Sequence, residues 1–235
     1  MTAARDLQAM LRCPSLYDYR RAGLRGDDAA NGYRLFARLL REGIARLRTA
    51  HGGDAWPASA PDAEREFAQE WDEQWPSDGA LGEWYRAAAT RAVRRTYHEL
   101  AHPDAPADAR YAQQQTISLD GHTVDVTLDA METVDGAPAL VLERATRRSD
   151  DAASVGVALY AAAARALAPD APPGVLIRYL DSGDTRAVPD PARVLAKHGP
   201  RLRQALDRLV RDDYPSAPHD DAECARCPLV FVCPR

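Results

Sequence analysis

The chain has 235 residues, 46% of them hydrophobic, and a formal net charge of −5. This length and composition allow one globular domain with a sizeable buried core. The acidic balance argues against a protein that binds polyanions over its whole surface, and no apolar segment is long enough to indicate secretion or membrane spanning. We therefore expect a cytoplasmic protein with no membrane partner.

The first hundred residues predict helices. Apolar residues recur at helical spacing in residues 4–24 and again in residues 31–48, which indicates two amphipathic helices. Residues 54–80 contain three prolines among acidic residues, so we expect a loop with a short helix there. Residues 82–100 predict a further helix, and a proline-containing break follows it.

Strands dominate the middle of the chain. From Gln113 onward apolar and polar residues alternate, and Asp-Gly pairs at 120–121 and 135–136 are turn signals. This pattern predicts a three-stranded meander. A second hairpin is expected around Ser182 and Gly183.

Two more helices complete the predicted elements. Residues 151–168 predict one, with Asp150 or Asp151 as its N-cap, and residues 191–211 predict the other. Helices, meander, helix, hairpin and helix together indicate an α/β (α+β) domain with a mixed central sheet.

Charge is unevenly distributed along the helical part. Lys197 is the only lysine, and arginines gather in residues 34–48 and 86–97, whereas residues 54–83 are acidic. Solvated helix faces explain both runs. The functional interpretation is a basic flank for a phosphate backbone, with the acidic stretch facing away from it or toward a partner.

Four cysteines lie at opposite ends of the chain. Cys13 stands near the start, whereas Cys224, Cys227 and Cys233 form a C-x2-C-x5-C tail. Thiolates in a reducing cytosol bind zinc or iron–sulfur clusters, and the tail alone fits either. A distant first ligand is unusual for zinc. A shared site would staple the chain ends and stabilise the fold by about 5 kcal/mol through loop closure.

Both ends of the sequence carry a family resemblance. The stretch LRCPSLYDYR at residues 11–20 and the closing RDDYPSAPHDDAECARCPLVFVCP at residues 211–234 resemble the RecB-like branch of the PD-(D/E)XK nuclease superfamily, which includes AddB nuclease domains. The resemblance covers most of the chain. It implies a restriction-endonuclease-like core, with a mixed sheet flanked by helices and a [4Fe-4S] cluster held by the four cysteines.

The resemblance also implies a domain organisation. One nuclease-like domain would span residues 1–235. Its parts, in order, would be the N-terminal helices with the first cysteine (1–53), an acidic helical insertion (54–110), the sheet and helix core (111–188), a helix (189–212) and the cluster-binding tail (213–235).

Family enzymes cut phosphodiesters with divalent ions held by carboxylates. By resemblance, Asp129 in TLDAME and Glu143 in LVLERAT occupy the two acidic positions and would hold Mg²⁺ or Mn²⁺, and Tyr160 matches the tyrosine of a Q-x-x-x-Y motif. Asp125 is an alternative first carboxylate. The other interpretation makes Asp129 and Glu143 ordinary polar residues on an open sheet face. His122 is expected at the surface.

Three family positions hold different residues. Ala145 replaces the lysine, Phe36 the metal-binding histidine of G-x-x-x-H, and Gly156 the glutamine of Q-x-x-x-Y. Arg144 is adjacent, but strand alternation points it to the opposite face from Glu143. Losing one charge-stabilising group commonly costs about 10² to 10³ in rate, so we expect a degenerate catalytic site.

Three functional hypotheses remain. The leading one is a DNA repair or recombination protein that binds DNA, single-stranded or at ends, and a helicase or recombination partner, without cutting. The second is a Mg²⁺- or Mn²⁺-dependent single-strand exonuclease that uses Asp129 and Glu143, with an arginine replacing the lysine. The third is a role outside nucleic acids, such as redox sensing.

Overall fold

The computed structural model describes residues 2–23, 32–75, 80–103 and 108–214 of the chain. Cys224, Cys227 and Cys233 lie outside these residues. The elements in chain order are β1 (Thr2–Ala3), α1 (Ala4–Arg12), α2 (Pro14–Arg21), α3 (Gly32–Ala50), α4 (Ala60–Gln74), α5 (Ala80–Ala101), β2 (Arg110–Leu119), β3 (His122–Val134), β4 (Ala137–Arg144), the 3-10 turn η2 (Asp151–Ala153), α6 (Val155–Leu167), β5 (Gly174–Tyr179), β6 (Thr185–Ala187) and α7 (Pro191–Arg211).

The sheet is mixed, as predicted, and β3 is its longest strand. β2 pairs antiparallel with β3 along one edge. The other edge of β3 is shared, because β4 pairs antiparallel with its second half and β1 pairs parallel near Val124 and Asp125. β5 then lies parallel to β4, and β6 antiparallel to β5.

The predicted meander is confirmed, including its turns. Asp120, Gly121, Asp135 and Gly136 all have positive φ angles, between 50° and 84°. A two-residue turn with both φ angles positive matches the right-handed twist of the paired strands, and Asp-Gly tolerates it.

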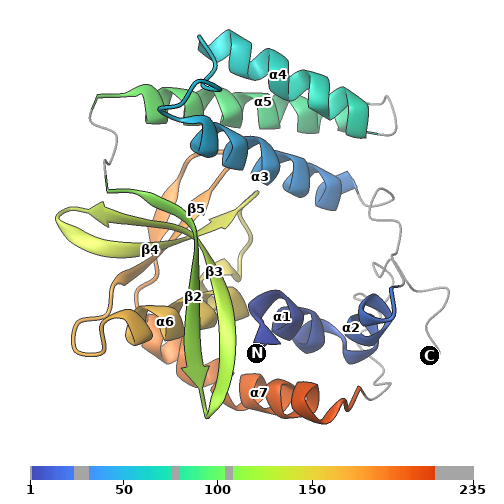
Figure 1. Cartoon of the computed structure of the whole chain (residues 1–235), viewed down its shortest axis with the longest axis vertical. Coiled ribbons are helices and arrows are strands. Elements are labelled where there is room, and N and C mark those ends of the chain that lie inside the picture. Colours follow the sequence, from blue (N-terminus) through green and yellow to red (C-terminus); the bar gives the residue numbers. More distant parts are fainter. Residues whose placement is uncertain (1, 24–31, 76–79, 104–107, 215–235) are drawn as a thin grey trace.

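Helices form two separate layers with separate hydrophobic cores (Figure 1). α1, α6 and α7 pack on one face of the sheet, where Leu7, Leu128 and Leu202 are buried together. α3, α4 and α5 form the second layer, which reaches the sheet through Ala145 and Leu180. Full burial of each large apolar side chain stabilises such a core by about 1.5 to 3 kcal/mol.

Three sequence-based boundaries were wrong. The first predicted helix is two helices, since α1 ends before Cys13 and Pro14 begins α2; a proline lacks the N–H that would continue the first helix. The short helix expected within residues 54–80 is α4, with 15 residues and a Ser59 N-cap. α6 is capped by Ser154, whose hydroxyl accepts from the Val157 N–H, and not by either aspartate before it.

The acidic stretch packs against the arginine-rich helices. Carboxylates of α4 pair with arginines of α3 and α5: Arg46 with Glu70, Arg94 with Glu64, and Arg86 with Asp72. These partly exposed pairs contribute at most about 1 kcal/mol each. They do neutralise the arginines on this side of α3 and α5, so the acidic stretch faces its own helical layer. No helix among the described residues is long and apolar enough to cross a membrane.

Candidate functional site

The two predicted carboxylates meet where the pairing of β3 with β4 ends. The last paired residues toward the site are Ala130 and Val141. One position further along β3, the Asp129 Oδ2 accepts a hydrogen bond of 2.8 Å from the Glu143 backbone N–H. The carboxylate of Asp129 thus takes the place of a ladder carbonyl, which fixes the two acidic residues side by side.

Tyr160, on α6, reaches the same point. Its hydroxyl oxygen accepts a hydrogen bond of 2.7 Å from the Asp129 backbone N–H. Burial and the charge of Asp129 raise the pKa of Tyr160 well above its ordinary value, so the phenol stays protonated. The structure therefore brings together the three residues that the sequence singled out as a site.

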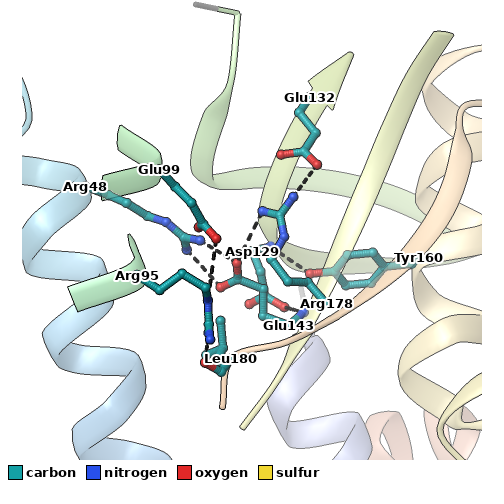
Figure 2. A network of polar contacts seen from close by, with 9 residues as sticks. All are labelled: Arg48, Arg95, Glu99, Asp129, Glu132, Glu143, Tyr160, Arg178 and Leu180. Carbon is teal, nitrogen blue, oxygen red and sulfur yellow. Dashed lines mark hydrogen bonds and ion pairs between the residues drawn. The ribbon is translucent and has the colours of Figure 1, made fainter. Parts of the chain in front are cut away.

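Arg48, from α3, binds Glu143 with both arms of its guanidinium (Figure 2). The two N···O distances are 2.8 and 2.5 Å, and the side chains are only 10% and 6% exposed. Burial alone would lower the pKa of Arg48, but hydrogen bonds and charge from Glu143 outweigh burial and raise it. Such a fork-to-carboxylate pair is the strong, oriented form of ion pair.

Arg48 also lies over the ring of Tyr111, 4.3 Å from the centroid. Its Nε is buried and lacks a hydrogen-bond partner within the described part of the chain. Glu143 and the aromatic ring therefore hold a guanidinium whose donors are not all satisfied. Leaving the Nε–H of a buried charged group unpaired costs free energy.

A second arginine approaches Glu143 from β5. Arg178 lies opposite Glu143 in the β4–β5 register and forms an ion pair with Glu132. Its other arm lies 3.9 Å from the Glu143 Oε1. Sequence reasoning missed Arg48, Arg178 and Glu132, because each contact joins distant segments.

Electrostatics at Asp129 reflect its burial. Burial raises the pKa of Asp129, the hydrogen bond from Glu143 opposes this, and the negative charge of Glu143 adds to it. Arg41 on α3 lowers the pKa through its positive charge. The net direction is upward, so the ionised carboxylate is less favoured here than in water.

Two of the substituted family positions belong to the hydrophobic core of the helical layer. Ala145 is buried beside Leu180 in this core. Phe36 is fully buried and stacks on Tyr85, with 4.7 Å between the ring centroids. Neither position brings a polar group to Asp129 and Glu143.

The third position, Gly156, makes room for Arg144. A Cβ atom on Gly156 would lie 2.6 Å from the Arg144 Nη2. Arg144 points along the start of α6, where it pairs with Asp151 at 3.6 Å and donates to the Ser154 hydroxyl. Glu143 and Arg144 therefore point to opposite faces of β4, as strand alternation predicts.

A cavity of about 490 Å³ surrounds the site. Asp125, Asp129, Glu143 and Tyr160 line it together with Arg41. Asp125, the alternative first carboxylate, accepts a hydrogen bond of 2.8 Å from Thr116. His122 lies elsewhere: at the start of β3 its side chain is 22% exposed and hydrogen-bonds Asp207 of α7 at 3.0 Å.

The donor set does not fit a divalent ion as it stands. Within the described residues, no three His, Cys, Asp or Glu side chains gather closely enough to hold a metal ion. Both oxygens of Glu143 face Arg48, and Asp129 Oδ2 faces the Glu143 N–H. Binding Mg²⁺ or Mn²⁺ there would require these contacts to open.

Cys13 lies at the junction of α1 and α2, and its N–H donates to the Ala9 carbonyl at 2.9 Å. The end of α7 approaches the same helices. The rings of Tyr17 and Tyr214 lie 5.3 Å apart, and Arg21 donates to Asp212 at 2.7 Å. The start of the C-terminal tail therefore packs beside the segment that carries Cys13.

Comparison with known proteins gives one family match. The family model described as "PD-(D/E)XK nuclease superfamily" matches residues 2–234. Among solved structures, the one titled "Crystal structure of SSO0001" is similar at 14% sequence identity and a TM-score of 0.37, covering 83% of this chain and 94% of that chain. No curated protein matches the sequence.

Proposed function

The chain belongs to the PD-(D/E)XK nuclease superfamily, and on this premise we propose that it binds DNA during DNA processing without cutting it. The observation that carries the proposal is the Arg48–Glu143 pair. It gives one acidic position of the family a permanent protein cation as its partner.

Arginine cannot replace a metal ion in this chemistry. A divalent ion polarises a bound water toward hydroxide and stabilises charge on the phosphate. The guanidinium of Arg48 supplies charge only, because it coordinates no water and stays protonated at every pH that proteins tolerate. A metal would also have to displace a buried ion pair, which costs several kcal/mol.

The replaced lysine and histidine positions also argue against cleavage. Ala145 and Phe36 are packed in the helical core, so no lysine or histidine equivalent comes from their positions. Each missing charge-stabilising group lowers a rate by about 10² to 10³, and together these reductions leave little activity. A nuclease fold with this site is better suited to holding a strand than to cleaving it.

An iron–sulfur staple is the second part of the proposal. Cys13, Cys224, Cys227 and Cys233 would together hold a [4Fe-4S] cluster, since four thiolates are the usual ligand set of such a cluster. The packing of Tyr214 on Tyr17 supports it, because Tyr214 lies beside the helix that directly follows Cys13. When bound, the cluster would cross-link the chain ends and reduce the entropy of the unfolded chain.

The spacing of the four cysteines and the resemblance at both chain ends support a place in the RecB-like, AddB-like branch of the superfamily. Nuclease domains of that branch act beside helicases, so a helicase or recombination partner in the cytoplasm is part of the proposal. DNA ends and single strands are the substrates that such partners generate.

An active exonuclease is the second candidate. The observation that favours it is the cavity that Asp129, Glu143 and Tyr160 share with Arg41. In that case an arginine would replace the missing lysine, and substrate binding would separate Glu143 from Arg48.

One assay distinguishes the two candidates. Anaerobically purified protein of confirmed iron content is incubated with end-labelled single-stranded and duplex DNA, with and without Mn²⁺, beside Glu143→Gln and Glu132→Gln. Glu132 is the matched control because it is also a buried carboxylate paired with an arginine. We expect bound but intact DNA in every case. Cleavage by the wild type and Glu132→Gln, but not by Glu143→Gln, would establish the exonuclease.

A further inference from the structure

A second cavity, of about 830 Å³, adjoins the carboxylate site and is dominated by arginine. The two cavities share Arg41 and Arg144 in their walls. Six arginines line the second one: Arg12, Arg34, Arg38, Arg41, Arg144 and Arg148. Among the described residues of its wall, the carboxylates are Asp150 and Asp151. We call it the arginine cavity.

Three of these arginines come from one face of α3. Arg34, Arg38 and Arg41 follow each other at i, i+4 and i+7, which places them on the same side of the helix. The opposite side of α3 is buried in the helical core. Because that core is apolar and α4 lies beyond it, this row of arginines is directed away from the acidic helix.

Arg38 and Arg41 carry the available positive charge of the arginine cavity. Asp151 pairs with Arg144 at 3.6 Å and accepts from the Arg148 backbone N–H at 2.7 Å. Arg38 and Arg41 are exposed, and neither has a carboxylate within ion-pair distance in the part of the chain that the structure describes. Unpaired guanidinium forks in a concave site match the geometry of phosphate oxygens.

The N-terminus of α6 adds to this environment. Ser154, its N-cap, lines the cavity. The N-terminal end of a 13-residue helix carries partial positive charge and favours a bound anion. Gly156, in the first turn, lets the Arg144 guanidinium lie against the helix, where a larger residue would displace it.

We infer that the arginine cavity binds the phosphates of a single-stranded DNA segment that continues from the carboxylate site. This rests on the proposed function and adds to it the place, the strand and the residues that bind. Since Arg41 and Arg144 border both cavities, a strand with one phosphate near Asp129 and Glu143 has its neighbouring phosphates among the arginines.

The size of the arginine cavity favours one strand over two. Its volume falls within the range of sites that enclose a ligand of nucleotide size. A nucleotide of a duplex enters such a concave site only after it unpairs and unstacks, which costs a few kcal/mol. A single strand enters without that cost, so we expect it to bind more tightly than a blunt duplex.

The test is the salt dependence of binding, measured by fluorescence anisotropy on the full chain with a labelled oligonucleotide. The variant is Arg38→Gln/Arg41→Gln. The matched control, Arg91→Gln/Arg186→Gln, removes the same charge from exposed positions outside the cavity. Removing one arginine that binds a phosphate reduces the slope of log affinity against log salt by about 0.7 for single strands. We therefore expect the slope to fall by about 1.4 and the affinity to weaken at least tenfold, with the control close to wild type.

Three other results would overturn the inference, in whole or in part. Equal affinity and slope in the two double variants would overturn the arginine cavity while leaving DNA binding intact. Tighter binding of a blunt duplex than of the single strand would overturn the single-strand assignment. Failure of the wild type to bind any DNA would overturn both this inference and the proposed function.

Discussion

Arg48 holds both carboxylate oxygens of Glu143 across 95 residues of sequence, and in doing so it joins the helical layer to the edge of the sheet. Arg95, on α5, makes a second connection by donating to the carbonyl of Leu180 (Figure 2). It also donates to the carbonyl of Asp181. The site therefore lies where two separately cored layers meet, and its central ion pair is the basis of the proposal that the protein binds DNA without cutting it.

The first prediction concerns the stability of that ion pair. Arg48→Met should lower the free energy of unfolding by about 3 to 5 kcal/mol, because it leaves the buried Glu143 charge without its partner. The double variant Arg48→Met/Glu143→Gln should be less destabilised than the sum of the two single variants. Denaturant unfolding measures all three. The exposed Arg46–Glu70 pair is the control, and a destabilisation in Arg48→Met no larger than in Arg46→Met would contradict the prediction.

The second prediction concerns pH. Burial raises the pKa of Asp129, so the unfolded chain ionises first: stability is lost as the pH rises from 3.8 to the raised value, and the loss is complete above it. Where the residue is protonated both folded and unfolded, it costs nothing. Asp129→Asn should therefore increase the free energy of unfolding at pH 8 by about 0.5 to 2 kcal/mol. The gain should vanish as the pH falls below the ordinary value of 3.8. A gain that is constant with pH would point to packing rather than ionisation.

The third prediction uses the space beside Gly156. Gly156→Ala should displace the Arg144 guanidinium, which is the flexible end of its side chain, at a cost to stability within about 1 kcal/mol. Binding of single-stranded DNA should weaken because a lining charge moves out of the arginine cavity. Gly199→Ala in α7 is the control, since its Cβ would meet open space. If the two variants bind DNA equally well, Arg144 takes no part in DNA binding at the arginine cavity.

The fourth prediction concerns the staple. Cys13→Ser should lower the iron content of anaerobically purified protein and its solubility together. Tyr17→Phe keeps the ring contact with Tyr214 and should retain iron, which separates the removal of a ligand from local disturbance. Iron analysis, the yield of soluble protein and a thermal scan are the measurements. An iron-free Cys13→Ser protein as stable as the wild type would argue against a structural cluster.

The sequence predicted those helices and turns well whose ends are determined by residues adjacent in the chain. α7 spans Pro191–Arg211 as expected, because Asp190 caps it and Pro191 suits the first helical position. The Asp-Gly pairs correctly indicated both turns of the meander. β1 was missed because a two-residue strand has no periodicity of its own and exists only through pairing with β3.

In the candidate site, too, features set by neighbouring residues were predicted and contacts between distant segments were not. Strand alternation placed Arg144 opposite Glu143 from sequence alone. Arg48 was not predicted as a partner of Glu143, since ion pairing depends on how α3 lies across the sheet. The sequence nevertheless contained a signal that this face of α3 is functional, because four arginines lie on it: Arg34, Arg38, Arg41 and Arg48.

The measurement that bears most directly on the Arg48–Glu143 pair is an anaerobic calorimetric titration of the full chain with Mn²⁺, beside Glu143→Gln and Glu132→Gln. We predict no stoichiometric binding that depends on Glu143, because Arg48 already occupies both of its oxygens. One Mn²⁺ bound by the wild type and by Glu132→Gln, but not by Glu143→Gln, would contradict a carboxylate pair closed by arginine and would indicate a metal-dependent nuclease.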